Sequence, residues 1–99
     1  MKYVTVTYPN KNDAKFDFDY YMRKHIPMVS RLLGTSIEVC KGLSSPTDAP
    51  LTHICIARIR INSAEEFSSA MAQHGAQIMG DIPNYTNIEP LIQIDEVLI

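Results

Sequence analysis

The order in which strand-like and helix-like periodicities follow one another limits the possible folds of this chain more than any single motif does. Four segments alternate or cluster β-branched and apolar residues as strands do, and two segments repeat apolar residues at helical spacing. The strand-like segments are residues 2–8, 36–43, 51–62 and 91–99, and the helical patterns begin near residues 18 and 63. The order βαββαβ predicts a ferredoxin-like α+β fold, with an antiparallel four-stranded sheet and two helices on one face.

Length and charge limit the class of protein. Ninety-nine residues, of which 45% are hydrophobic and 20% charged, are typical of one folded domain, which we expect to span residues 1–99. The net charge is -2, and no basic stripe is present, so a nucleic-acid partner is not expected. No apolar run is long enough to cross a membrane, and the N-terminus alternates like a strand rather than a signal peptide. We therefore expect a cytoplasmic protein.

Local signals mark the ends of both helices. Asp17 is a predicted N-cap for a helix that runs from Phe18 to residue 33, and Gly34 suits the position after its C-terminus. Ser63 followed by Glu66 forms a predicted capping box for the second helix. From Gly75 onward the sequence predicts at most one extra turn and then a loop, before the last strand.

The third strand-like segment, LTHICIARIRIN at residues 51–62, is apolar on both faces. A sheet with one wet face would alternate, so both sides of this strand are expected to be covered. The helices cover one side, and a second copy of the same sheet is the simplest cover for the other. The pattern therefore predicts a homodimer through the open sheet face. Cys40 and Cys55, with no CxxC spacing, are expected to be buried free thiols.

The first helix carries two unusual residues on or beside its apolar stripe, His25 and Pro27. His25 is either a buried, neutral core histidine or a group that moves protons near neutral pH. Pro27 lacks an N–H and crowds the carbonyl of Arg23, so a local bend is expected. The bend either lets the helix curve over the sheet or turns His25 toward a pocket, and both can hold together. Tyr21, one turn earlier, is either core or orients His25.

Three stretches of sequence resemble a known family. They are VTVTYPN at residues 4–10, FDFDYYMRKHIPMV at residues 16–29 and MGDIPNYTNIEPLIQIDEV at residues 79–97. Their combination of FDxDYYxxKHxP with a late IPNYT is similar to the EthD domain family, within the dimeric α+β barrel superfamily. The family takes its name from a gene cluster for ethyl tert-butyl ether degradation. The resemblance implies a ferredoxin-like monomer that pairs its sheets into a barrel, with a small-molecule cavity between sheet and helices.

The resemblance also implies roles for particular residues. His25 would face the cavity as a general acid/base and Tyr21 would orient it. The residues expected to contact the ligand are Asn84, Tyr85, His74 and Met22. The PNYT segment, residues 83–86, serves either ligand binding or assembly. Proton transfer, as in an isomerase, a dehydratase or a cofactor-free monooxygenase, is the chemistry that these groups support on a small apolar or aromatic molecule.

Other readings remain open at this stage. The main alternative is a non-catalytic accessory protein that binds or delivers an intermediate of a degradation pathway, and a haem-binding protein is a third reading. The three histidines lack HxH or HExxH spacing, so no metal site is expected. No glycine-rich phosphate loop and no GxSxG motif is present. We therefore expect no cofactor.

Overall fold

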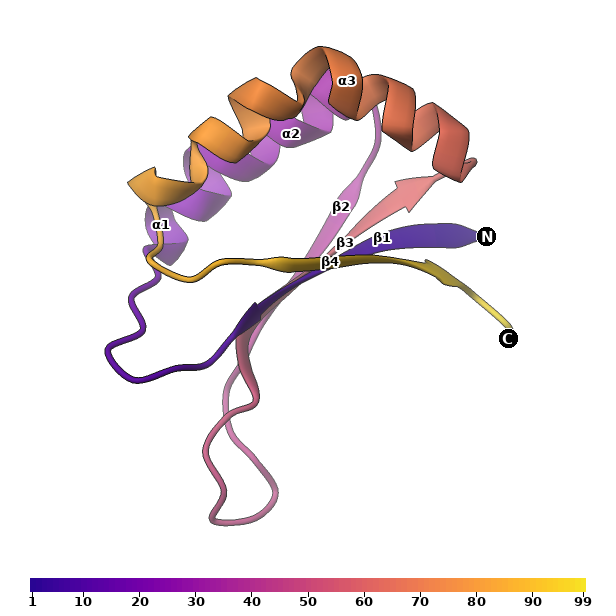
Figure 1. The fold of residues 1–99 in the computed structure, drawn as a ribbon. Coiled ribbons are helices and arrows are strands. Elements are labelled where there is room, and N and C mark those ends of the chain that lie inside the picture. Colours follow the sequence, from indigo (N-terminus) through magenta and orange to yellow (C-terminus); the bar gives the residue numbers. More distant parts are fainter.

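A computed structural model describes residues 1–99. Its four strands form one antiparallel sheet in the order β2-β3-β1-β4, and all the helices lie on one face of that sheet (Figure 1). The strands are β1 (Lys2–Pro9), β2 (Ile37–Lys41), β3 (His53–Ile61) and β4 (Leu91–Glu96). The predicted ferredoxin-like βαββαβ fold is confirmed.

The first helical region is continuous but not uniform. It consists of α1 (Phe18–Tyr20), a π-helical turn η1 (Tyr21–His25) and α2 (Ile26–Leu33). In the π turn, the N–H of Ile26 donates to the carbonyl of Tyr21, five residues earlier. Pro27 follows at once, in the first turn of α2, where a missing N–H is best tolerated. The bend expected at Pro27 therefore takes the form of a widened turn before the proline.

Both ends of this region are as the sequence predicted. The Asp17 carboxylate accepts a hydrogen bond from the N–H of Tyr20 at 3.0 Å. Gly34 closes α2 with φ of 65°, in the left-handed region that glycine adopts without strain. The two signals therefore set the start and the end of the helix.

The second helix, α3 (Ala64–Gly80), is longer than predicted. The Ser63 hydroxyl accepts the N–H of Glu66 at 3.1 Å, as the capping box predicted. The sequence predicted one extra turn from Gly75 and then a loop, whereas the helix continues without a break to Gly80, with both Gly75 and Ile78 buried. Burial of Ile78 in the core outweighs the helix penalty of a glycine, which is about 1 kcal/mol. A short 3₁₀ turn, η2 (Ile82–Asn84), then leads toward β4.

Two groups of buried side chains fill the space between helices and sheet. An aliphatic group of Val4, Val29, Ile59 and Ile78 joins β1, β3, α2 and α3. A second group, rich in aromatic residues, joins β1, η1, β3 and the segment before β4; its buried members are Tyr8, Tyr21, Cys55, Tyr85 and Ile88. The aromatic group brings hydroxyl groups into an otherwise apolar interior.

The face of the sheet away from the helices has no cover in the monomer. Cys40 on β2 points to this side and is exposed, so the prediction that both cysteines are buried was wrong for Cys40 and right for Cys55. The reason is position: β2 is an edge strand, and Cys40 alternates with Val39, which packs toward the helices. None of the helices is long and apolar enough to cross a membrane.

Candidate functional site

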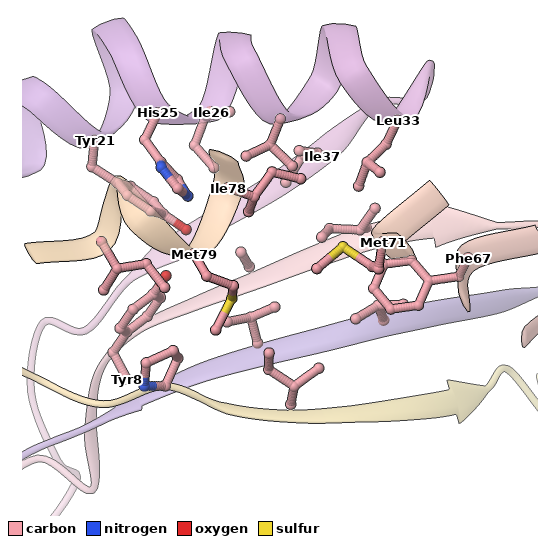
Figure 2. Close-up of a pocket in the computed structure, with 18 residues that line it drawn as sticks. Tyr8, Tyr21, His25, Ile26, Leu33, Ile37, Phe67, Met71, Ile78 and Met79 are labelled. Carbon is pink, nitrogen blue, oxygen red and sulfur yellow. The ribbon is translucent and has the colours of Figure 1, made fainter. Parts of the chain in front are cut away.

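A cavity of about 50 Å³ lies between the sheet and the helices (Figure 2). Apart from His25 and two tyrosines, its walls are apolar side chains from β1, β3, α2, α3 and the start of β4. Two of the lining residues, Met79 on α3 and Ile92 on β4, are 44% and 46% exposed. The cavity therefore meets solvent between the C-terminal part of α3 and β4.

One end of the cavity is polar. Tyr8 extends from the end of β1, on the same side of the strand as Val4 and Val6, while Tyr21 and His25 descend from the helix above (Figure 2). The π turn stacks the rings of Tyr21 and His25, with centroids 5.5 Å apart and planes inclined by 16°. Residues i and i+4 lie on the same side of a helix, and both side chains line the cavity.

The Nδ1 atom of His25 lies 2.9 Å from Oδ2 of Asp81, the residue that follows α3. The other carboxylate oxygen, Oδ1, accepts hydrogen bonds from the Tyr20 hydroxyl at 2.6 Å and from Nδ2 of Asn84 at 2.9 Å. The side chain of His25 is only 6% exposed and that of Asp81 16%. Asp81 thus fixes the imidazole of His25 through Nδ1, and the Asp81 carboxylate is itself fixed by Tyr20 and Asn84.

The surroundings shift both pKa values downward. Burial lowers the pKa of His25, and the attraction of Asp81 offsets that effect only in part. For Asp81, partial burial alone would raise the pKa, but hydrogen bonds donated by Tyr20, Asn84 and His25 outweigh it and lower the pKa. Near neutral pH the pair is therefore a neutral imidazole beside a carboxylate, a combination suited to accepting a proton.

The other ring nitrogen of His25 faces a pair of tyrosine hydroxyls. Its Nε2 atom lies 3.3 Å from the Tyr85 hydroxyl, which lies 2.8 Å from the Tyr8 hydroxyl. Burial raises the pKa of both tyrosines, so both hydroxyls are protonated at neutral pH. The four side chains Asp81, His25, Tyr85 and Tyr8 form one line of hydrogen bonds from the protein edge to the cavity, named here the Asp81–Tyr8 chain.

The structure brings together some of the residues that the sequence singled out. His25, Tyr21 and Tyr85 are buried side by side, at 4%, 1% and 3% exposure. Asn84 donates a hydrogen bond to Asp81 and does not line the cavity. Tyr21 stacks on His25, and the group that holds Nδ1 is Asp81.

Two residues expected at the ligand site lie elsewhere. Met22 is 46% exposed, and His74 is half-buried on α3; neither lines the cavity. Helical spacing assigned both to apolar stripes. Met22 follows Tyr21 directly, so it lies at the edge of the face that Tyr21 and His25 share.

Sequence reasoning missed Asp81, Tyr8 and Tyr20. Asp81 stands directly before IPNYT, in the third stretch that carries the family resemblance, and Tyr20 stands within the second. Nothing in the helical or strand periodicity pairs residue 81 with residue 25. A signal for Asp81 was thus present in the motif, but its partner depends on how α3 lies over η1.

Two other kinds of chemistry would need a cluster of metal-binding side chains or a reactive thiol. No group of three or more His, Cys, Asp or Glu side chains is arranged to hold a metal ion. Burial raises the pKa of Cys55 to about 12, which keeps its thiol protonated. The chemistry that the site can offer from its own side chains is therefore proton transfer and hydrogen bonding.

Comparisons with known proteins agree with this architecture. No protein-family profile and no curated protein sequence matches the chain. Among solved structures, an EthD-like protein from Ralstonia eutropha JMP134 is 43% identical, with a TM-score of 0.91, over 99% of this chain and 92% of the other. An ethyl tert-butyl ether (EthD) family protein from Bacillus halodurans C-125 is 18% identical, with a TM-score of 0.77, over 99% of each chain. HapK from Hahella chejuensis shares the fold at 15% identity and a TM-score of 0.62, over 100% of this chain and 95% of HapK.

Proposed function

This chain belongs to the EthD-like family, and we propose that its cavity binds a small, mostly apolar organic molecule on which His25 carries out proton transfer. The observation that carries this proposal is a buried histidine that lines an apolar cavity while its far nitrogen is held by Asp81. Clusters of this kind, with perturbed pKa values in a concave apolar site, are typical of acid–base centres.

The contacts of His25 support an enzyme rather than a binding-only accessory protein. A purely structural histidine is commonly satisfied by backbone groups, whereas both ring nitrogens here meet side chains that can themselves exchange protons. The reaction types we propose are isomerisation, dehydration or cofactor-free oxygenation of a small apolar or aromatic molecule. All three begin with removal or addition of a proton.

The size of the cavity indicates that binding needs movement at its mouth. A cavity of about 150 Å³ is known to hold benzene, whereas this one measures about 50 Å³. Met71 and Met79 line it, and methionine side chains change rotamer easily. We propose that Met79, which is partly exposed, moves aside to admit the ligand.

Binding can be tested with toluene, using protein labelled with ¹³C on the methionine methyl groups. Toluene should shift the signals of Met71 and Met79, which line the cavity, and leave those of Met1 and Met22 in place. The Ala57→Leu variant should abolish the shifts, because Ala57 is buried on the cavity wall. Ala72→Leu, at an exposed position of α3, is the matched control and should bind as the wild type does.

We further propose that the chain forms a homodimer through the open sheet face. Ile54 and Ile56 of β3 and Leu91 of β4 lie on that face, and three exposed apolar side chains follow β4: Val97, Leu98 and Ile99. An apolar surface of this extent favours a second copy.

Light scattering at micromolar concentration should then give twice the 11.2 kDa of one chain. Ile56→Glu should reduce the mass to that of one chain, because it places a charge on the proposed contact face. Met22→Glu, on the helical side, should leave the mass unchanged. A wild-type mass of 11.2 kDa would refute the dimer.

A further inference from the structure

We propose that the Asp81–Tyr8 chain has one fixed hydrogen-bond direction, so that Tyr8 presents an acceptor to the cavity and selects apolar ligands that carry a hydroxyl group, such as phenols and enols. This inference rests on the proposed function and narrows it to a class of ligand. It follows from counting donors and acceptors along the chain.

The direction is set at Asp81. Its carboxylate has only acceptors, and it meets the Tyr20 hydroxyl, Nδ2 of Asn84 and Nδ1 of His25. The contact with Nδ1, at 2.9 Å, is a hydrogen bond only when that nitrogen carries the hydrogen. Because the imidazole is neutral, Nε2 is then left as an acceptor with no hydrogen of its own.

The two tyrosines then have no choice of orientation. The Tyr85 hydroxyl must donate to Nε2 of His25, across 3.3 Å. Its single hydrogen is used, so in its contact with Tyr8, across 2.8 Å, Tyr85 accepts and Tyr8 donates. At the cavity the Tyr8 oxygen has its two lone pairs left to offer. The neighbouring Tyr21 hydroxyl can meet one of them, and the other is open to a ligand.

A ligand hydroxyl can donate its hydrogen to the Tyr8 oxygen. A ligand with only a carbonyl or ether oxygen has no hydrogen to donate, so no hydrogen bond to Tyr8 would form. The same direction allows a balanced proton transfer. The ligand O–H bond breaks as its proton passes to Tyr8, the Tyr8 proton passes to Tyr85, and the Tyr85 proton passes to Nε2. His25 becomes an imidazolium ion beside the Asp81 carboxylate, and the ligand becomes a phenolate or enolate.

The hydrogen-bond direction can be measured directly by ¹⁵N NMR of the imidazole at pH 7.5. In the wild type, His25 should carry its proton on Nδ1. In Asp81→Asn the amide NH₂ donates to Nδ1 while its oxygen keeps the Tyr20 bond, so the proton should move to Nε2. Asn84→Ala, which removes a neighbour of Asp81 but not of His25, should keep the wild-type tautomer. A wild-type proton on Nε2 would overturn the proposal.

Ligand selection can be measured with three probes of similar size: phenol, toluene and benzaldehyde. Wild-type protein should bind phenol about tenfold more tightly than toluene, the effect of one added hydrogen bond. Tyr8→Phe should abolish this preference while toluene still binds. Asp81→Asn should shift the preference toward benzaldehyde. This substitution reverses the hydrogen-bond direction along the Asp81–Tyr8 chain, so that Tyr8 donates to the ligand.

The outcomes separate this inference from the proposed function. If toluene binds but phenol has no advantage, or if Tyr8→Phe keeps the advantage, the inference fails and ligand binding in the cavity stands. If none of the three probes shifts the Met71 and Met79 signals, both proposals fail.

Discussion

The carboxylate of Asp81 lies 2.9 Å from Nδ1 of His25, although the two residues are 56 positions apart in the chain. The contact joins the end of α3 to the π turn of the first helical region. It fixes the orientation of the imidazole, so that the other ring nitrogen, Nε2, faces the Tyr85 hydroxyl. The orientation of the imidazole therefore depends on how α3 lies against the first helical region, not on either helix alone.

The first prediction concerns pH and stability. Because burial lowers the pKa of His25 in the folded protein, and Asp81 offsets this only in part, the unfolded chain binds the proton more readily. This contribution to stability should be lost as the pH falls through the unperturbed histidine pKa of about 6.5. Urea unfolding of the wild type and of His25→Gln between pH 8 and 5 measures the loss. The stability advantage of the wild type should shrink on acidification.

His74→Gln is the control for that experiment, since His74 lies half-buried on α3 away from the cavity. It should show the same pH dependence as the wild type. A His25→Gln variant that keeps the full wild-type slope would contradict the prediction.

The second prediction concerns the two hydroxyls of the Asp81–Tyr8 chain. Tyr85→Phe removes the link between His25 and Tyr8 and should lower the free energy of unfolding by about 1–3 kcal/mol. Tyr8→Phe removes the same hydroxyl–hydroxyl bond from the other side. In a double-mutant cycle measured by urea unfolding, the two substitutions should couple by about 0.5–3 kcal/mol. Strict additivity would mean that the 2.8 Å contact contributes nothing.

The third prediction compares a substitution in the buried wall of the cavity with one at its partly exposed mouth. Ile78 is 7% exposed and packs with Val4, Val29 and Ile59, so Ile78→Ala should cost about 2–5 kcal/mol of unfolding free energy. Met79 is 44% exposed, so Met79→Ala should cost less than about 1 kcal/mol. Met79→Ala should also speed the association of toluene, seen in stopped-flow or exchange NMR. An unchanged association rate would argue for entry by another route.

The fourth prediction compares two glycines. Gly34 has φ of 65°, and an added Cβ would meet no atom within 4 Å, so the cost of Gly34→Ala is backbone strain alone, about 1–2 kcal/mol. Gly80 lies at the end of α3, again with no atom within 4 Å of an added Cβ. Gly80→Ala should therefore raise stability by up to about 1 kcal/mol. Thermal melting of the two variants should move in opposite directions.

The sequence alone determined the order of the elements and most of their ends. Alternation at residues 2–8 and helical spacing from Phe18 are local patterns, and caps such as Asp17, Gly34 and Ser63 act through bonds to residues three or four positions away. Such interactions can be predicted from the sequence because both partners lie close together along it. The inward position of His25 belongs to this group, since a helical stripe defines a face.

Tertiary structure decided what meets His25. Asp81, Tyr85 and Tyr8 come from three other parts of the chain, and their contacts exist only because α3 and β1 converge on η1. The length of α3 beyond Gly75 was likewise set by burial of Ile78, which outweighs local propensity. The π turn itself has no signal in apolar spacing, because the periodicity argument assumes a regular helix. Long-range packing thus placed Asp81 and Tyr85 against a histidine whose inward position the sequence alone had predicted.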